Sequence, residues 1–95
     1  MSYTFEWDEN KSQRCFVERG FDFAYAARAF YDADKQIKPD RRYQYGEDRF
    51  TLSGYIEARL YVIAYTVRED VIRIISARKA NAREVKHHEH HQNAN

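Results

Sequence analysis

The sequence has a single cysteine, Cys15, and no long apolar run. One cysteine excludes a disulfide within the chain and suits a protein of the reducing cytoplasm. The first ten residues contain neither a basic segment nor an apolar segment, so we expect no signal peptide. No stretch approaches the length of about 20 apolar residues that a membrane-spanning helix needs. We therefore predict a cytoplasmic protein that does not cross a membrane.

The chain also lacks a dominant charge. Its 95 residues carry 16 Lys and Arg against 15 Asp and Glu, and the net charge is +1 with neutral histidines. Overall charge therefore does not identify a nucleic-acid-binding protein. The distribution is uneven, because residues 73–86 contain five basic residues and one acid, Glu84. A local basic surface can bind phosphate, although a solvated helix face explains such a run more often.

Periodicity predicts the secondary structure. Alternating residues indicate strands, and apolar residues at helical spacing indicate helices. The expected strands are 3–7, 49–56, 59–67 and 71–78, with an extended segment at 35–40, and the expected helices are 9–19, 23–31 and one that starts near Asn81. Asp8 and Asp22 are candidate N-caps. Gly20 is a candidate helix end, and Asn81 with Glu84 resembles a capping box.

This order of elements predicts an α+β fold. Two N-terminal helices should pack on a mainly antiparallel sheet of about four strands, and a C-terminal helix should follow. The length suits a single domain with one hydrophobic core. We expect that domain to cover residues 1–91 and residues 92–95 to form a frayed tail.

The strand expected at 71–78 carries basic and polar residues among its isoleucines. Alternation would place Ile72, Ile74, Ser76 and Arg78 on one face, and Val71, Arg73, Ile75 and Ala77 on the other. Arg73 would then be separated from Arg78, and a β-bulge would bring the two together. An arginine in an apolar strand needs a carboxylate, solvent or an anionic ligand.

A second charged stretch, DRRYQYGEDR, covers residues 40–49. Its mixed signs are typical of a charge network that fixes a loop, formed by Asp40, Arg41, Arg42, Glu47 and Arg49. Two members also suit chemistry: Glu47 is a candidate general base and Arg49 a candidate phosphate clamp.

The segment HHEHH offers histidines near the end of the chain. His87 lies three residues before His90 and four before His91, so a helix would put them on one face. A closed zinc site needs further ligands, and Gln92 stands where an H-E-x-x-H motif requires its second histidine. We therefore expect no metal site. A solvated helix end and a role in proton transfer both remain open, because histidine titrates near neutrality.

Several motifs together resemble one family. FEWD, DRRYQYGEDR, AYTVRED and IRIISARKANARE are similar to the BrnT family of bacterial toxins, which belong to type II toxin–antitoxin pairs and have a RelE-like fold. The resemblance runs from about Phe5 to Glu89. Its most specific pieces are G-E-x-R at 46–49, Y-T-x-R at 65–68 and R-I-I-S-A-R at 73–78.

The resemblance implies a ribonuclease that uses no metal or other cofactor and arrests translation. It also implies a BrnA-type antitoxin that neutralises the toxin and binds DNA, so that the toxin reaches DNA only through this partner in an oligomeric complex. The chain departs from the family pattern in the first helix, where Cys15, Glu18 and Arg19 replace Asn, Lys and His. It departs again at His88, where the family tends to have Tyr.

These considerations predict the residues of a site. Arg73 and Arg78 would stabilise the anionic phosphorane, with Ser76 as a hydrogen-bond donor. His87 or His88 would transfer protons. The residues expected to position RNA are Arg49, Lys79, Arg83 and Lys86. The alternative is a non-catalytic homologue whose basic and aromatic surface binds its antitoxin and serves operon regulation.

Overall fold

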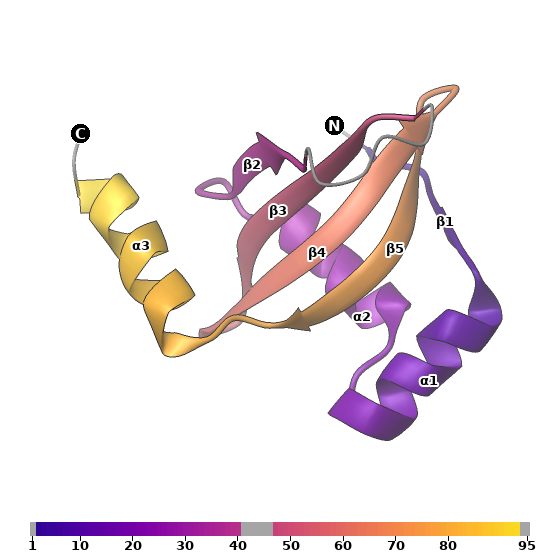
Figure 1. Ribbon diagram of the computed structural model, residues 1–95, viewed down its shortest axis with the longest axis horizontal. Helices are drawn as coiled ribbons and strands as arrows, with labels where there is room; N and C mark the ends of the chain where they lie inside the picture. The colour runs from indigo at the N-terminus through magenta and orange to yellow at the C-terminus, as the bar shows by residue number, and fades with distance from the viewer. Residues whose placement is uncertain (1, 41–46, 94–95) are drawn as a thin grey trace.

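The computed structural model describes residues 2–40 and 47–93 of the chain (Figure 1). The strands are β1 (Phe5–Trp7), β2 (Gln36–Pro39), β3 (Arg49–Ile56), β4 (Arg59–Arg68) and β5 (Val71–Lys79). The helices are α1 (Glu9–Arg19), α2 (Phe23–Ala26), the short 3₁₀ helix η1 (Ala27–Tyr31) and α3 (Ala82–Asn93). Arg41, Arg42 and Gly46, which belong to the charged stretch and the G-E-x-R motif, lie outside the described residues.

The strands form one five-stranded sheet with the order β1-β5-β4-β3-β2. The α+β class is confirmed, but the predicted sheet of about four mainly antiparallel strands is wrong in detail. β1 pairs in parallel with β5, with Phe5 opposite Ile72 and Trp7 opposite Ile74. This parallel pairing was not predicted because the sequence of a three-residue strand does not indicate a partner strand more than sixty residues away along the chain.

One face of the sheet, called the inner face below, packs against α1, α2 and η1 (Figure 1). It carries the hydrophobic core, in which Phe30, Leu52, Ile63 and Ile74 are almost fully buried. Aromatic rings fill much of this layer, because Phe30 meets the rings of Tyr3, Phe5 and Tyr65 edge to face at centroid distances of 5.0 to 5.9 Å. Such pairs add stability beyond the area that they bury.

Local capping signals account for the helix starts. The Asp8 carboxylate accepts hydrogen bonds from the backbone N–H groups of Asn10 and Lys11, at 2.8 and 3.3 Å. Asp22 accepts one from Tyr25 N–H at 2.9 Å. Gly20 ends α1 with φ of 86°, a left-handed conformation that glycine adopts without steric cost. The helix predicted at 23–31 is instead a single α-turn followed by η1.

The helix α3 lies on the opposite face, called the outer face below. Its N-terminus is the predicted capping box: Glu84 N–H donates to the Asn81 side chain at 2.8 Å, and Asn81 N–H donates to Glu84 Oε1 at 2.9 Å. The buried His88 ring meets the Tyr55 ring edge to face at 5.3 Å, and the Gln36 amide donates to the His88 carbonyl at 3.1 Å. The helix passes residue 91 and continues to Asn93.

Candidate functional site

A β-bulge in β5 determines which side chains share a face. Ala64 of β4 pairs with Ser76, but the next residue, Tyr65, pairs with Ile74, so Ile75 is an extra residue in the ladder. The alternation of side chains therefore changes phase at Ile75. Ile72 and Ile74 are buried before the bulge, and Ala77 is buried after it. The bulge that would unite the two arginines is thus present.

Arg73, Ser76 and Arg78 consequently lie on the outer face together. Their partners on β4 are Thr66, Ala64 and Val62, three successive positions of one face. Such positions are about 7 Å apart along a strand, so Arg73 and Arg78 stand about 13 Å apart at their backbones. Arg49 pairs with Thr66 from the other side of β4, in the same row as Arg73. The structure thus brings four of the predicted site residues onto one face.

Carboxylates hold the arginines of this face. Arg73 Nη1 donates to Glu6 Oε2 at 3.2 Å, which is the carboxylate partner that its place in an apolar strand requires. Arg78 forms a two-pronged pair with Glu84, at 2.7 and 2.8 Å. The hydrogen bonds from Arg78 lower the pKa of Glu84 to about 2, so this carboxylate is ionised at neutral pH and orients the guanidinium.

Glu47, the candidate general base, also forms an ion pair. Its carboxylate accepts two hydrogen bonds from Arg68, at 2.9 and 3.1 Å. Nearby, the Thr66 hydroxyl donates to the Asp48 carbonyl. These contacts join the start of β3 to the end of β4 and give Glu47 a structural role in the described part of the charged stretch.

The predicted histidines separate into two environments. His87 is exposed and lines a hollow of about 350 Å³ with Gln36, Lys38 and Ser53 on the outer face. His88 is only 1% exposed and faces Tyr55 of the sheet from α3, so its burial argues against direct contact with a substrate. No group of three metal-ligating residues occurs among the side chains that the structure describes.

The remaining predicted RNA-binding residues lie on two different elements. Lys79 pairs with Tyr61, in the inner-face row of β4, and lines a pocket with Phe16 and Phe21. Arg83 and Lys86 are exposed on α3. Basic residues that are close in sequence are thus divided between a strand and a helix.

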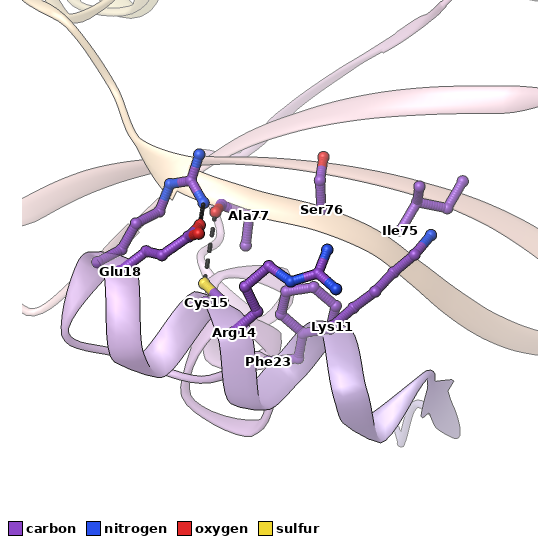
Figure 2. A pocket seen from close by; sticks show the side chains of 9 residues that line it. Lys11, Arg14, Cys15, Glu18, Phe23, Ile75, Ser76 and Ala77 are labelled. Carbon is purple, nitrogen blue, oxygen red and sulfur yellow. Dashed lines mark hydrogen bonds and ion pairs between the residues drawn. The ribbon is translucent and has the colours of Figure 1, made fainter.

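A pocket that sequence reasoning missed lies between α1 and β5 (Figure 2). It has a volume of about 230 Å³ and is lined by Lys11, Arg14, Cys15, Glu18, Arg19, Phe23, Ile75, Ser76 and Ala77. All three positions at which α1 departs from the family pattern are among them. The spacing of residues 11, 14, 15 and 18 indicates one helix face, but not the element that this face meets.

Cys15 closes the floor of this pocket. It is 3% exposed, and its Sγ donates to the carbonyl of Ala77 at 3.6 Å. Burial raises the pKa of the thiol, so the group stays protonated at neutral pH and is a poor nucleophile. It is a small core residue rather than a reactive one.

Comparison with known proteins decides the family. No curated protein matches the chain. Residues 7–84 match the model of a family described as ribonuclease toxin, BrnT, of type II toxin–antitoxin systems. The chain belongs to the BrnT family. The match covers every element from the end of β1 to the first turn of α3, and so includes Arg73, Ser76, Arg78 and Glu84.

Membership of the BrnT family implies an antitoxin partner, because these toxins act in type II pairs. None of the helices in the described part of the chain is long and apolar enough to cross a membrane.

Proposed function

We propose that this BrnT toxin is a metal-independent endoribonuclease that cleaves RNA by attack of a 2′-hydroxyl on the adjacent phosphate, and thereby arrests translation in the cytoplasm. The observation that carries the proposal is the bulge at Ile75, which places Arg73, Ser76 and Arg78 on one solvent-facing surface. A regular strand of this sequence would divide the two arginines between opposite faces.

The reaction requires removal of the 2′-hydroxyl proton, stabilisation of a crowded anionic phosphorane and protonation of the leaving 5′-oxygen. Arg73 and Arg78 serve the second requirement, since a guanidinium forms paired hydrogen bonds to phosphate oxygens and keeps its charge. Ser76 lies between them and supplies a hydroxyl donor. The several N–H donors of a guanidinium let it bind a carboxylate and a phosphate together, so the pair with Glu84 does not prevent this role.

Proton transfer is assigned to His87, which is exposed and lies over the outer face. Its neighbour Ser53 pairs with Val62, which pairs with Arg78. Adjacent strands are about 4.8 Å apart, so Ser53 and Arg78 are separated by about 10 Å across the sheet. One well-placed acid or base contributes about 10²- to 10⁴-fold in rate. His88 has no part in this scheme because its ring is buried.

The partner in this proposal is a BrnA-type antitoxin, which covers the outer face, forms an oligomer with the toxin and binds the DNA of their operon. An acidic segment of such a partner would pair with the same arginines that bind phosphate. Binding of the antitoxin and binding of RNA would then exclude each other.

The test uses a defined single-stranded RNA in EDTA, with the parent, Arg73→Ala/Arg78→Ala, and a control with the same charge change, Arg28→Gln/Lys35→Gln. Arg28 and Lys35 lie in and after η1, away from the outer face of β5. We expect the parent and the control to leave 2′,3′-cyclic phosphate ends and the double alanine variant to leave RNA intact. Equal cleavage by all three proteins would remove the two arginines from the mechanism.

A test in cells follows the same logic. Arg78→Ala should abolish growth arrest while the purified variant keeps its fold by circular dichroism. Full toxicity of this variant would exclude Arg78 from the chemistry.

A second candidate function is a non-catalytic module that binds the antitoxin. Phe16 and Val17 favour it, because these adjacent apolar residues of α1 are 53% and 74% exposed. Salt distinguishes the two functions. RNA affinity falls steeply with salt when phosphates dominate, whereas an apolar protein interface responds weakly. No cleavage of free or ribosome-bound RNA, together with salt-insensitive antitoxin binding, would favour the module.

A further inference from the structure

The pocket between α1 and β5 exists because β1 is short. β1 covers the edge of β5 only from Ile72 to Ile74. From Ile75 onward α1 takes the place of a neighbouring strand, and the Ala77 carbonyl accepts a hydrogen bond from the Cys15 Sγ rather than from a strand. The bulge lies at the same point. The open edge of β5 therefore begins at the residue where the alternation of its side chains between the two faces is shifted by the bulge.

Two cations of α1 extend toward this edge. Lys11 and Arg14 are exposed, lie one helical turn apart and reach up toward β5 in Figure 2. Among the described residues neither of them forms an ion pair. Glu18, which stands four residues after Arg14, pairs with Arg19 instead, at 3.7 Å. Like charges one turn apart repel each other, so this arrangement suits an anion placed between them.

We propose that Lys11 and Arg14 form a subsite for a backbone phosphate of single-stranded RNA, in the pocket between α1 and the open edge of β5. The proposal rests on the ribonuclease function proposed above and extends its substrate path. RNA would lie across the outer face at Arg73 and Arg78, pass the edge of β5 beside Ser76, and place the next phosphate between the two α1 cations.

Three observations favour a phosphate over another ligand. The volume of about 230 Å³ is smaller than the roughly 300 to 1,000 Å³ of pockets for larger organic ligands. Ser76 belongs both to the pocket lining and to the row of Arg73 and Arg78, so the pocket continues the basic face. A nucleic-acid strand carries one negative charge per nucleotide. Such a row of charges can contact cations that are spread along a path, whereas a single carboxylate can contact only one place on it.

The experiment measures binding of a single-stranded 2′-O-methyl RNA, which cannot be cleaved because its 2′-oxygen is blocked. Lys11→Gln/Arg14→Gln is compared with the parent and with the control Arg28→Gln/Lys35→Gln over a range of salt concentrations. Both variants lose two positive charges, so a general charge effect appears equally in the two. Circular dichroism and thermal unfolding verify that each variant is folded.

We expect affinity at low salt to fall about tenfold or more in the α1 variant, since one charge-assisted hydrogen bond contributes about that factor. The slope of log affinity against log salt should decrease in magnitude by about 1.4, which is two contacts at about 0.7 each for a single strand. With cleavable RNA, KM should rise while kcat changes little, because the subsite positions a phosphate away from the reacting one.

An unchanged slope and KM in the α1 variant would overturn the subsite, even if the parent cleaves RNA. If the slope and KM were unchanged but the α1 variant bound a poly-glutamate peptide more weakly than the parent, the pocket would instead be a site for an acidic protein segment, and the RNA subsite would be overturned. A reduced slope in the α1 variant would support the subsite whether or not the parent cleaves RNA. If the parent cleaved nothing, the ribonuclease function alone would be refuted. The failures of the two proposals are therefore distinguishable.

Discussion

The two faces of the sheet are formed by the same strands but differ in the side chains that they carry. The inner face buries aromatic and aliphatic side chains under α1, α2 and η1, with Phe30, Leu52 and Ile63 at most 2% exposed. The outer face carries Arg73, Ser76 and Arg78 in a row, and α3 packs on it at one end, against Tyr55 and Gln36. Packing stabilises the first face, whereas arginine–carboxylate pairs are a main feature of the second. The difference can be tested by changes that affect one face alone.

The largest expected effect is a truncation on the inner face. Ile63→Ala should lower the free energy of unfolding by about 2–5 kcal/mol, because the site is fully buried and a cavity remains. The neighbouring residue on the outer face is the matched control. Val62→Ala should cost only about 1 kcal/mol, since Val62 is half-buried. Urea unfolding measures both values, and equal losses would contradict the distinction between the faces.

The next effect comes from adding an atom on the inner face. A Cβ at Gly54 would lie 2.6 Å from the carbonyl oxygen of Ala29 in η1. Gly54→Ala should therefore destabilise the protein by about 1–3 kcal/mol, as overpacking does. Ser53→Ala, one residue earlier and on the outer face, is the control and should change the free energy of unfolding by less than about 0.5 kcal/mol. A neutral Gly54→Ala would show that η1 can move away from β3.

A deletion tests the boundary between the two faces. Removal of Ile75 should restore regular pairing and keep Arg73, Ser76 and Arg78 on the outer face, because Ile75 is the extra residue of the bulge. Stability should fall less than in Ile63→Ala, and RNA cleavage should persist. Deletion of Ile63, which is fully buried and regularly paired with Ala77, is the control of equal length and should prevent folding. Loss of cleavage on removal of Ile75, with the fold retained, would mean that the bulge itself shapes the site.

The smallest effect concerns the attachment of α3 and depends on pH. The pKa of Glu84 is about 2, below its ordinary value of 4.5. Its contribution is therefore fully present above about pH 4.5 and is lost as the pH falls toward 2. Glu84→Gln should cost about 1 kcal/mol at pH 7, the usual contribution of a helix cap. The gap between parent and variant in urea unfolding should close by about pH 2. The control, Glu89→Gln, removes an exposed carboxylate of the same helix and should unfold like the parent at pH 7.

Local signals allowed most element boundaries to be predicted. Asp8, Asp22 and the Asn81–Glu84 box each cap the helix that follows, because a cap acts within a few residues of itself. Non-local features were not predictable in the same way. The pairing of β1 with β5 depends on three-dimensional proximity, and the one-turn α2 gives way to η1 where Ala29 meets Gly54.

The site shows the same division. Residue types suggested Arg73, Ser76 and Arg78, but only the bulge shows that they share a face. Lys11 and Arg14 were missed because a helical period tells which residues lie together and not what they lie against. His88 was proposed for proton transfer and is buried against Tyr55, because the sequence did not show that this turn of α3 faces the sheet.

The parallel pairing of β1 with β5 has a consequence for the timing of synthesis. Translation proceeds from the N-terminus, so β1 and α1 leave the ribosome long before β5 and the Glu84 that orients Arg78. Contacts this distant along the chain form late. A toxin organised in this way has no complete basic face while it is still being made. The cleavage site proposed above is therefore incomplete during most of the toxin's own synthesis, which leaves that time for the antitoxin to be made.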